Sequence, residues 1–187
     1  MNIANKISTF RILSVPFFVA SLVYYSPQRS YLRILALAIF ILAAISDAAD
    51  GYMARRSKQQ SKAGLILDPV GDKLLLMSAF VCLSVNSNFD IRFPLWVILV
   101  VISRDVIIIL GAIVVYVVKQ KLNIIPSGWG KLTTAFQMLA IISVLLQLHI
   151  SPVLWWLAVI YTVISGAIYI NKGFKILYAL DNPRNNH

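Results

Sequence analysis

Four aspartates carry most of the chemistry available to this chain, which has seven acidic residues and no glutamate. Asp47 and Asp50 are three residues apart and Asp68 and Asp72 are four apart, so on helices each pair shares one face. Carboxylates that converge at the rim of a hydrocarbon layer repel one another and lose hydration, so a cation must neutralise them. An all-oxygen ligand set, with no histidine or cysteine nearby, favours Mg²⁺ or Mn²⁺, and four carboxylates make two ions plausible.

Small residues and one arginine accompany these aspartates. Gly51, Ala54 and Gly64 leave bare backbone on the helix faces that carry the carboxylates, where a bulky planar group has room. Arg55 is placed to bind a phosphate oxygen through its planar guanidinium. Arg55 and Lys73 are also possible partners of the aspartates, but neither stands at the spacing of an intrahelical ion pair. For each small residue alone, a helix kink or plain packing is the ordinary interpretation.

The composition around this window indicates a membrane protein. The chain is 59% apolar with a mean hydropathy of +0.80, and its apolar residues occur in long blocks. We predict an all-α integral membrane protein with a short interfacial helix over Met1–Arg11. A single membrane domain is expected over residues 1–180, followed by a disordered tail at 181–187. The six predicted transmembrane helices correspond to Ile12–Tyr25, Leu32–Ala49, Leu74–Val85, Pro94–Val118, Leu132–Leu148 and Val153–Ile170.

The basic residues predict the orientation in the bilayer. Lysine and arginine total 17, and most of them flank the ends of blocks that meet at one side of the membrane. The positive-inside rule then places both termini and the acidic window on the cytoplasmic side of the membrane, which in a bacterium would be the inner membrane. Only Arg29, Arg33 and Arg92 fall on the other side. The sequence has no basic stripe interleaved with aromatic residues, so it does not indicate a nucleic-acid-binding protein. Cys82 is the only cysteine, so a disulfide within the chain is excluded.

The aspartates and small residues together carry a family resemblance. The pattern D-x2-D-G-x2-A-R-x8-G-x3-D-x3-D begins at Asp47, ends at Asp72, and resembles the signature of the CDP-alcohol phosphatidyltransferases at every position. The length and the six-helix layout are also similar. The resemblance implies a homodimer with a cytoplasm-facing cavity that is open to the bilayer. It implies transfer of a phosphatidyl group from CDP-diacylglycerol to an alcohol, with release of CMP.

The same resemblance implies a role for each position of the pattern. Two divalent ions, Mg²⁺ or Mn²⁺, would be held by Asp47, Asp50 and Asp68. Asp72 would serve as the general base and also touch metal. The cytidine diphosphate pocket would be lined by Gly51, Ala54, Arg55 and Gly64.

The acceptor is less clearly encoded. Residues 126–137 resemble the phosphatidylglycerophosphate synthase and cardiolipin synthase branches, and the matching residues Lys131, Thr134 and Gln137 are candidates for acceptor binding. Thr133 stands where the former branch often carries a second lysine, and Ser103–Val106 looks more like the latter. The expectation therefore leans towards phosphatidylglycerol, a phospholipid acceptor, with glycerol 3-phosphate as the alternative.

Arg104 and Asp105 are ionisable residues within an apolar block, which makes them functional candidates. Neighbours on a helix point about 100° apart, so we expect them not to neutralise each other simply. Arg104 either meets the acceptor phosphate or pairs with an aspartate of the second or third apolar block.

Two other classes share part of this pattern. An intramembrane prenyltransferase also uses paired aspartates with Mg²⁺, but it leaves the glycines, Ala54 and Arg55 unexplained. A cation channel or transporter predicts carboxylates spread through the membrane depth, whereas these four gather at one rim beside basic residues.

Overall fold

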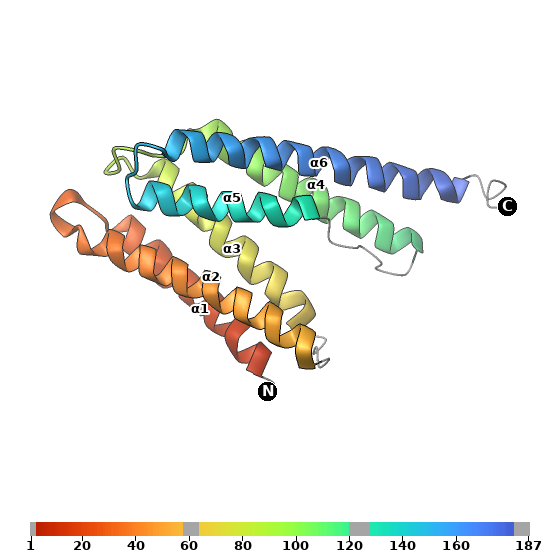
Figure 1. Cartoon of the computed structure of the whole chain (residues 1–187), viewed down its shortest axis with the longest axis horizontal. Coiled ribbons are helices and arrows are strands. Elements are labelled where there is room, and N and C mark those ends of the chain that lie inside the picture. Colours follow the sequence, from red (N-terminus) through yellow and green to blue (C-terminus); the bar gives the residue numbers. More distant parts are fainter. Residues whose placement is uncertain (1–2, 58–63, 120–127, 182–187) are drawn as a thin grey trace. The chain divides into compact units, whose positions relative to one another are not determined.

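The structure, a computed structural model, describes residues 3–57, 64–119 and 128–181. Within helices, the side chains at 3–10, 47–57, 64–70, 72, 112–119, 172 and 174–181 lie outside this description. All regular structure in the described ranges is helical, as predicted (Figure 1). The elements are α1 (Ile3–Val23), the 3-10 turn η1 (Pro27–Arg29), α2 (Tyr31–Ser57), α3 (Gly64–Val85), α4 (Leu95–Lys119), α5 (Gly128–Leu145) and α6 (Ser151–Asp181).

Each predicted apolar block coincides with the main part of one helix. The second and third blocks lengthen as expected, because α2 runs on through the acidic window to Ser57 and α3 begins at Gly64. The connections fall at Pro27, at Asn86 and at Ser151, where turn-forming residues interrupt the apolar pattern. The linker 58–63 and most of the predicted tail, 182–187, lie outside the described residues.

The separate interfacial helix predicted over Met1–Arg11 is wrong. The structure has one continuous helix, α1, from Ile3 to Val23. No glycine or proline separates Lys6 from Arg11, and Arg11 itself is buried, so nothing ends the helix at this point. Pro16 lies inside α1 without ending it.

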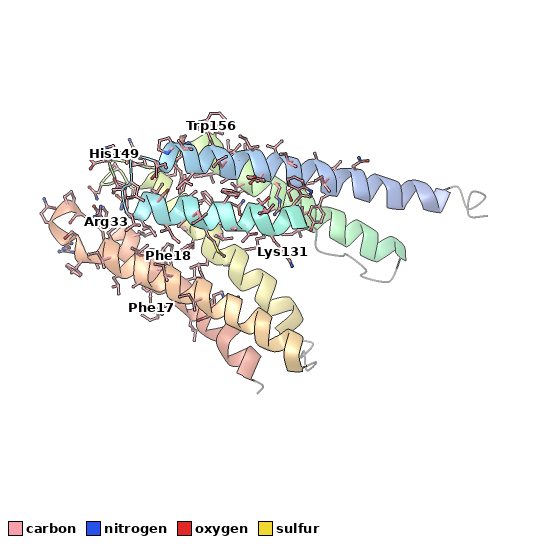
Figure 2. All side chains as sticks on the ribbon, viewed as in Figure 1. Phe17, Phe18, Arg33, Lys131, His149 and Trp156 are labelled. Carbon is pink, nitrogen blue, oxygen red and sulfur yellow. The ribbon has the colours of Figure 1, made fainter. Side chains whose placement is uncertain are left out.

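Two helices are long and apolar enough to cross a membrane in the part of the chain that was described. They are Gly128–Leu145 and Ser151–Asn171. Shorter apolar helical stretches cover Arg11–Val23, Tyr31–Ser46 and Lys73–Val85. Figure 2 draws the side chains of these helices, and many of the large apolar ones are exposed. Exposed apolar surface of this extent is typical of a protein that contacts lipid or another protein. The six-span topology stays a prediction.

The chain divides into two compact units, and the first contains the acidic window. It comprises Met1–Phe93 and Ile141–Ser151. In this unit α1 packs against both α2 and α3, which touch each other much less. The core is aromatic: the ring centroids of Phe18 and Phe40 are 5.8 Å apart, and those of Phe80 and Phe93 are 4.7 Å apart.

Side-chain amides hold the connections at one end of this unit. The Asn86 amide donates to the carbonyl of Leu22 (2.6 Å), and Asn88 donates to the carbonyl of Tyr25 (2.9 Å). Gln147 exchanges two hydrogen bonds with the backbone of Ile91, both of 2.9 Å. The first two bonds tie the C-terminal end of α1 to the segment that follows α3, and the last two tie that segment to Gln147.

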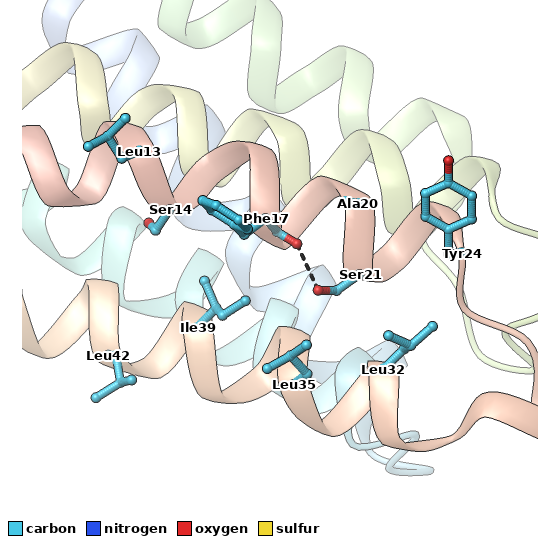
Figure 3. A pocket seen from close by; sticks show the side chains of 10 residues that line it. All are labelled: Leu13, Ser14, Phe17, Ala20, Ser21, Tyr24, Leu32, Leu35, Ile39 and Leu42. Carbon is cyan, nitrogen blue, oxygen red and sulfur yellow. Dashed lines mark hydrogen bonds between the residues drawn. The ribbon is translucent and has the colours of Figure 1, made fainter.

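A groove of about 600 Å³ lies along α1 and α2 in the first unit (Figure 3). Its lining is apolar apart from two serines and a tyrosine. Both serine hydroxyls donate to carbonyls of their own helix, Ser14 to that of Arg11 and Ser21 to that of Phe17. The groove therefore suits hydrocarbon, and the polar part of a ligand needs another site.

The second unit comprises Pro94–Ala140 and Pro152–His187. It contains α4, most of α5, and α6. Aromatic pairs join these helices, with Trp96 and Trp156 at 4.9 Å and the stacked rings of Phe136 and Tyr161 at 4.5 Å. Small residues such as Ala140 and Ala158 are fully buried, which lets helices approach closely in a membrane protein.

Candidate active site

Helix periodicity relates the acidic residues of α2 to the buried stripe of that helix. Ala36, Phe40 and Ala43 are buried in the first unit at spacings of four and three residues. The same spacing, continued along the helix, reaches Asp47, Asp50 and Ala54. Helix periodicity therefore predicts that the first two aspartates share the buried face of α2.

α3 shows the same pattern in the opposite chain direction. Leu76, Ala79 and Leu83 form a buried stripe. Four-residue steps back from Leu76 reach Asp72 and then Asp68. Both aspartate pairs thus belong to helices that pack against α1, and their backbone positions lie towards the end of α2 and the start of α3.

The structure describes the backbone at every position of the pattern and the side chains at none. Asp47, Asp50, Gly51, Ala54 and Arg55 are in α2, and the remaining three, Gly64, Asp68 and Asp72, are in α3. The predicted carboxylate geometry and the CDP pocket lie outside the described side chains and stay predictions.

The donor set fits the predicted metal. Two helix faces bring four oxygen-donor residues to one end of the unit, and such hard ligands suit Mg²⁺ or Mn²⁺. Among the described side chains no group of three metal-ligating residues occurs, and the four aspartate side chains lie outside that description, so the metal site stays a prediction.

Arg104 and Asp105 form an ion pair, so the expectation that they do not neutralise each other is wrong. The Arg104 Nη1 atom lies 2.7 Å from Asp105 Oδ1, and the two residues are only 8% and 3% exposed. The long arginine side chain bends back to its neighbour and so overcomes the 100° separation. The predicted pairing of Arg104 with an aspartate of the second or third block involves side chains outside the described residues and stays a prediction.

A polar cluster surrounds Arg104 within the second unit. Its Nη2 atom donates to Ser165 Oγ on α6 (2.9 Å), and its guanidinium lies 5.9 Å from the ring centre of Tyr169. From α5, the buried Gln137 donates to Thr162 Oγ1 (3.2 Å). Because Thr162 and Ser165 are three residues apart, Arg104 and Gln137 reach the same face of α6 on adjacent turns.

Two atoms in this polar cluster have no hydrogen-bond partner among the described residues. They are Arg104 Nε, a donor, and Gln137 Oε1, an acceptor. Buried polar atoms are nearly always satisfied, so each is a position where a ligand or water group is expected. A donor and an acceptor together suit a phosphorylated alcohol, which offers phosphate oxygens and a hydroxyl.

The other predicted acceptor residues have different surroundings. Lys131 is exposed at the start of α5. The Thr134 hydroxyl donates to the carbonyl of Gly130 in its own helix (3.1 Å), so its hydrogen is already used. Thr133, which replaces a lysine of one branch, is buried and bonds to the carbonyls of Trp129 and Tyr161. The structure thus brings Gln137 to Arg104 through α6, while Lys131 remains at the surface.

The sequence interpretation missed the contribution of α6. Thr162, Ser165 and Tyr169 recur at spacings of three and four residues in an otherwise apolar helix. This periodicity was a signal that one face of the helix is polar. Gly166 belongs to the same face, since a Cβ there would lie 3.5 Å from Arg104 Cγ.

Comparison with known proteins covers nearly the whole chain. Residues 1–164 match the family model described as CDP-alcohol phosphatidyltransferase. A relative from Mycobacterium tuberculosis, "Probable phosphatidylglycerophosphate synthase", is 33% identical over 180 residues, covering 93% of this chain and 82% of the relative.

Two further relatives bear the name "CDP-diacylglycerol--glycerol-3-phosphate 3-phosphatidyltransferase". The protein from Aquifex aeolicus is 31% identical over 186 residues, covering 95% of this chain and 99% of its own. The Bacillus subtilis protein is 28% identical over 195 residues, covering 94% and 97%. These alignments include both the acidic window and the polar cluster around Arg104.

Proposed function

The chain belongs to the CDP-alcohol phosphatidyltransferase family, and on this basis we propose that it transfers the phosphatidyl group of CDP-diacylglycerol to glycerol 3-phosphate. It is an enzyme, a transferase of phospholipid synthesis, and its family is membrane-associated. The products are phosphatidylglycerophosphate and CMP.

One observation carries the choice of acceptor. Relatives that align with at least 93% of this chain are named for glycerol 3-phosphate transfer or for phosphatidylglycerophosphate synthesis. The sequence pattern leaned towards phosphatidylglycerol, through Thr133 and Ser103–Val106, and the names of the relatives support the alternative instead. We therefore propose that glycerol 3-phosphate can bind although position 133 is a threonine and not a lysine.

The donor half of the reaction is assigned to the acidic window. Asp72 takes the proton of the acceptor hydroxyl, and the resulting oxygen attacks the phosphorus that bears diacylglycerol. The bond from that phosphorus to the bridging oxygen breaks, and this oxygen leaves with CMP. Arg55 holds a phosphate oxygen, while Gly51, Ala54 and Gly64 leave room for the nucleotide.

Asp47, Asp50 and Asp68, with Asp72 touching the same site, would hold two Mg²⁺ or Mn²⁺ ions. Bound there, the ions would stabilise negative charge on the attacking and leaving oxygens. The backbone positions of both pairs, towards the end of α2 and the start of α3 within the first unit, support this assignment.

The acceptor half is assigned to the polar cluster around Arg104. Its remaining Nε–H binds a phosphate oxygen of glycerol 3-phosphate, and Gln137 Oε1 accepts from a glycerol hydroxyl. The two partnerless buried atoms support this assignment. Lys131 and Thr134 are the additional candidates, with Lys131 supplying charge at the start of α5.

The membrane arrangement follows from the sequence. We infer six spans with both termini and the acidic window in the cytoplasm, and a homodimer as the family's usual assembly. The match of residues 1–164 to the family model favours a CDP-alcohol phosphatidyltransferase over a prenyltransferase or a cation channel.

An acceptor panel tests the proposed function. Purified full-length protein, CDP-diacylglycerol and Mg²⁺ are incubated with glycerol 3-phosphate, phosphatidylglycerol, inositol phosphate or serine. We expect CMP release and phosphatidylglycerophosphate only with the first. Cardiolipin formed from phosphatidylglycerol would contradict the acceptor and keep the family, whereas no CMP from folded protein with any alcohol would contradict the transferase itself.

Replacement of Arg104 by glutamine should raise the KM for glycerol 3-phosphate by about tenfold or more, because one charge-assisted hydrogen bond to phosphate is lost. The KM for CDP-diacylglycerol should stay within about twofold. The measurement is initial rates of CMP release with each substrate varied in turn.

A matched double variant controls for folding. Arg104→Gln alone leaves Asp105 buried without its ion-pair partner, which is strongly destabilising. Arg104→Gln with Asp105→Asn removes both charges together. The raised KM should persist in this double variant; if the KM returns to the wild-type value while the protein folds, Arg104 acts on structure and does not bind the acceptor.

A further inference from the structure

Arg11 is a buried cation at the end of the core of the first unit. It is only 1% exposed, and charged residues are almost never buried to this degree unless they are paired with another group. It continues the buried stripe of α1 formed by Ser14, Phe18 and Leu22. The sequence pattern counted it only among the cations that set membrane orientation.

The height of Arg11 along α2 can be derived from a ring contact. Phe18 on α1 and Phe40 on α2 pack with their centroids 5.8 Å apart, and the two helices run in opposite directions (Figure 1). Arg11 precedes Phe18 by seven residues, and Asp47 follows Phe40 by seven. Each step of seven residues moves about 10.5 Å towards the same end of the unit. Arg11 therefore lies at the height of Asp47.

On the other side, the Arg11 stem passes the backbone of α3. A Cβ added at Gly71 would lie 3.7 Å from Arg11 Cδ and 3.3 Å from Ile12 Cγ1. Gly71 directly precedes Asp72 and follows Asp68 by three residues. The absence of a side chain at Gly71 thus allows α1 to bring this arginine against the helix that carries the second aspartate pair.

We propose that Arg11 is a positioning residue of the donor site, a fixed positive charge that holds the four carboxylates together and sets their affinity for divalent metal. This deepens the proposed function, on which it rests. A guanidinium is charged at every physiological pH, so it reduces carboxylate repulsion whether or not metal is bound. The same charge repels incoming cations and so weakens metal binding, which allows bound divalent ions to exchange with those in solution.

The test uses full-length protein in detergent and needs no turnover. Arg11→Met removes the charge and keeps a long side chain, and Arg11→Lys keeps the charge. Thermal unfolding is recorded without divalent ion and across a Mn²⁺ titration, and Mn²⁺ binding is measured directly by electron paramagnetic resonance. Arg29→Met, an exposed cation in η1 at the opposite end of the unit, is the matched control.

We expect Arg11→Met to have a lower Tm without metal, a larger rise in Tm with Mn²⁺, and a Mn²⁺ Kd smaller by about tenfold. Arg11→Lys should keep a Kd within about twofold of wild type, and Arg29→Met should change neither quantity. An equal loss of Tm with and without Mn²⁺, together with an unchanged Kd, would show that Arg11 only packs and would overturn the proposal.

Charge compensation keeps the proposal testable if Arg11→Met does not fold. Adding Asp47→Asn removes one carboxylate at the same height, so the double variant should be more stable without metal than Arg11→Met alone. A double variant no more stable than the single, or one that also fails to fold, contradicts the proposal. A wild-type protein that binds no Mn²⁺ would contradict the proposed function, which separates the two failures.

Discussion

Asp72→Asn is expected to lower the rate of CMP release by about a hundredfold or more, because general-base catalysis contributes on this scale. Asparagine has nearly the shape of aspartate but cannot accept the proton of the acceptor hydroxyl. Binding of CDP-diacylglycerol should survive within a few fold, since Asp47, Asp50 and Asp68 remain. The two measurements are CMP release at saturating glycerol 3-phosphate and the rise in Tm caused by CDP-diacylglycerol.

Asp90→Asn is the matched control for this experiment. Asp90 is exposed in the connection between α3 and α4, whereas Asp72 is in the first half of α3. It should keep wild-type turnover and stability. Turnover by Asp72→Asn at a rate near that of wild type would show that another group is the base.

Much of the donor site was predictable because helix periodicity determines which residues share a face. Spacings of three and four residues put Asp47 with Asp50 and Asp68 with Asp72 before any fold is known. The structure adds the buried stripes of α2 and α3, from which the same spacing leads to both pairs. The sequence alone does not reveal these stripes, because both helices are apolar on several sides. The bounds of α2 and α3 were anticipated for the same reason, since each apolar block extends into its polar flank.

The acceptor cluster was predictable only in part. Arg104 and Gln137 were identified from type and resemblance, but their meeting on α6 depends on how α4, α5 and α6 pack. The ion pair of Arg104 with Asp105 depends on a side-chain rotamer, and residue spacing argues against it. The sequence around Arg104 does not predict this rotamer, because the rotamer depends on the burial of both Arg104 and Asp105 in the folded protein.

Arg11 shows a different limit of sequence reasoning. An arginine ahead of an apolar block is ordinarily a topology signal, and nothing near it in the chain suggests otherwise. Its importance comes from Gly71, sixty residues away, which lets α1 approach α3. The continuous α1 follows from the same contact, since a buried Arg11 belongs to the packed helix and not to an interfacial one.

Asp50→Asn should raise the Mg²⁺ concentration for half-maximal CMP release by about tenfold or more, since one anionic ligand of a hard cation is lost. Affinity for CDP-diacylglycerol should fall in parallel, because the pyrophosphate is held through the same ions. This coupling separates Asp50 from Asp72, whose replacement removes turnover while binding persists. The measurements are Mg²⁺ titrations of CMP release and of the Tm shift that CDP-diacylglycerol causes.

Asp90→Asn again provides the control, and its Mg²⁺ requirement should match that of wild type. Asp50→Glu restores the charge on a longer side chain, so we expect its Mg²⁺ requirement to lie between those of wild type and Asp50→Asn. An Asp50→Asn titration that overlays the wild-type curve would remove this residue from the ligand set. The remaining three aspartates would then have to hold the metal, and a site for two ions would lose its main support, because each ion needs several anionic oxygens that neutralise its charge.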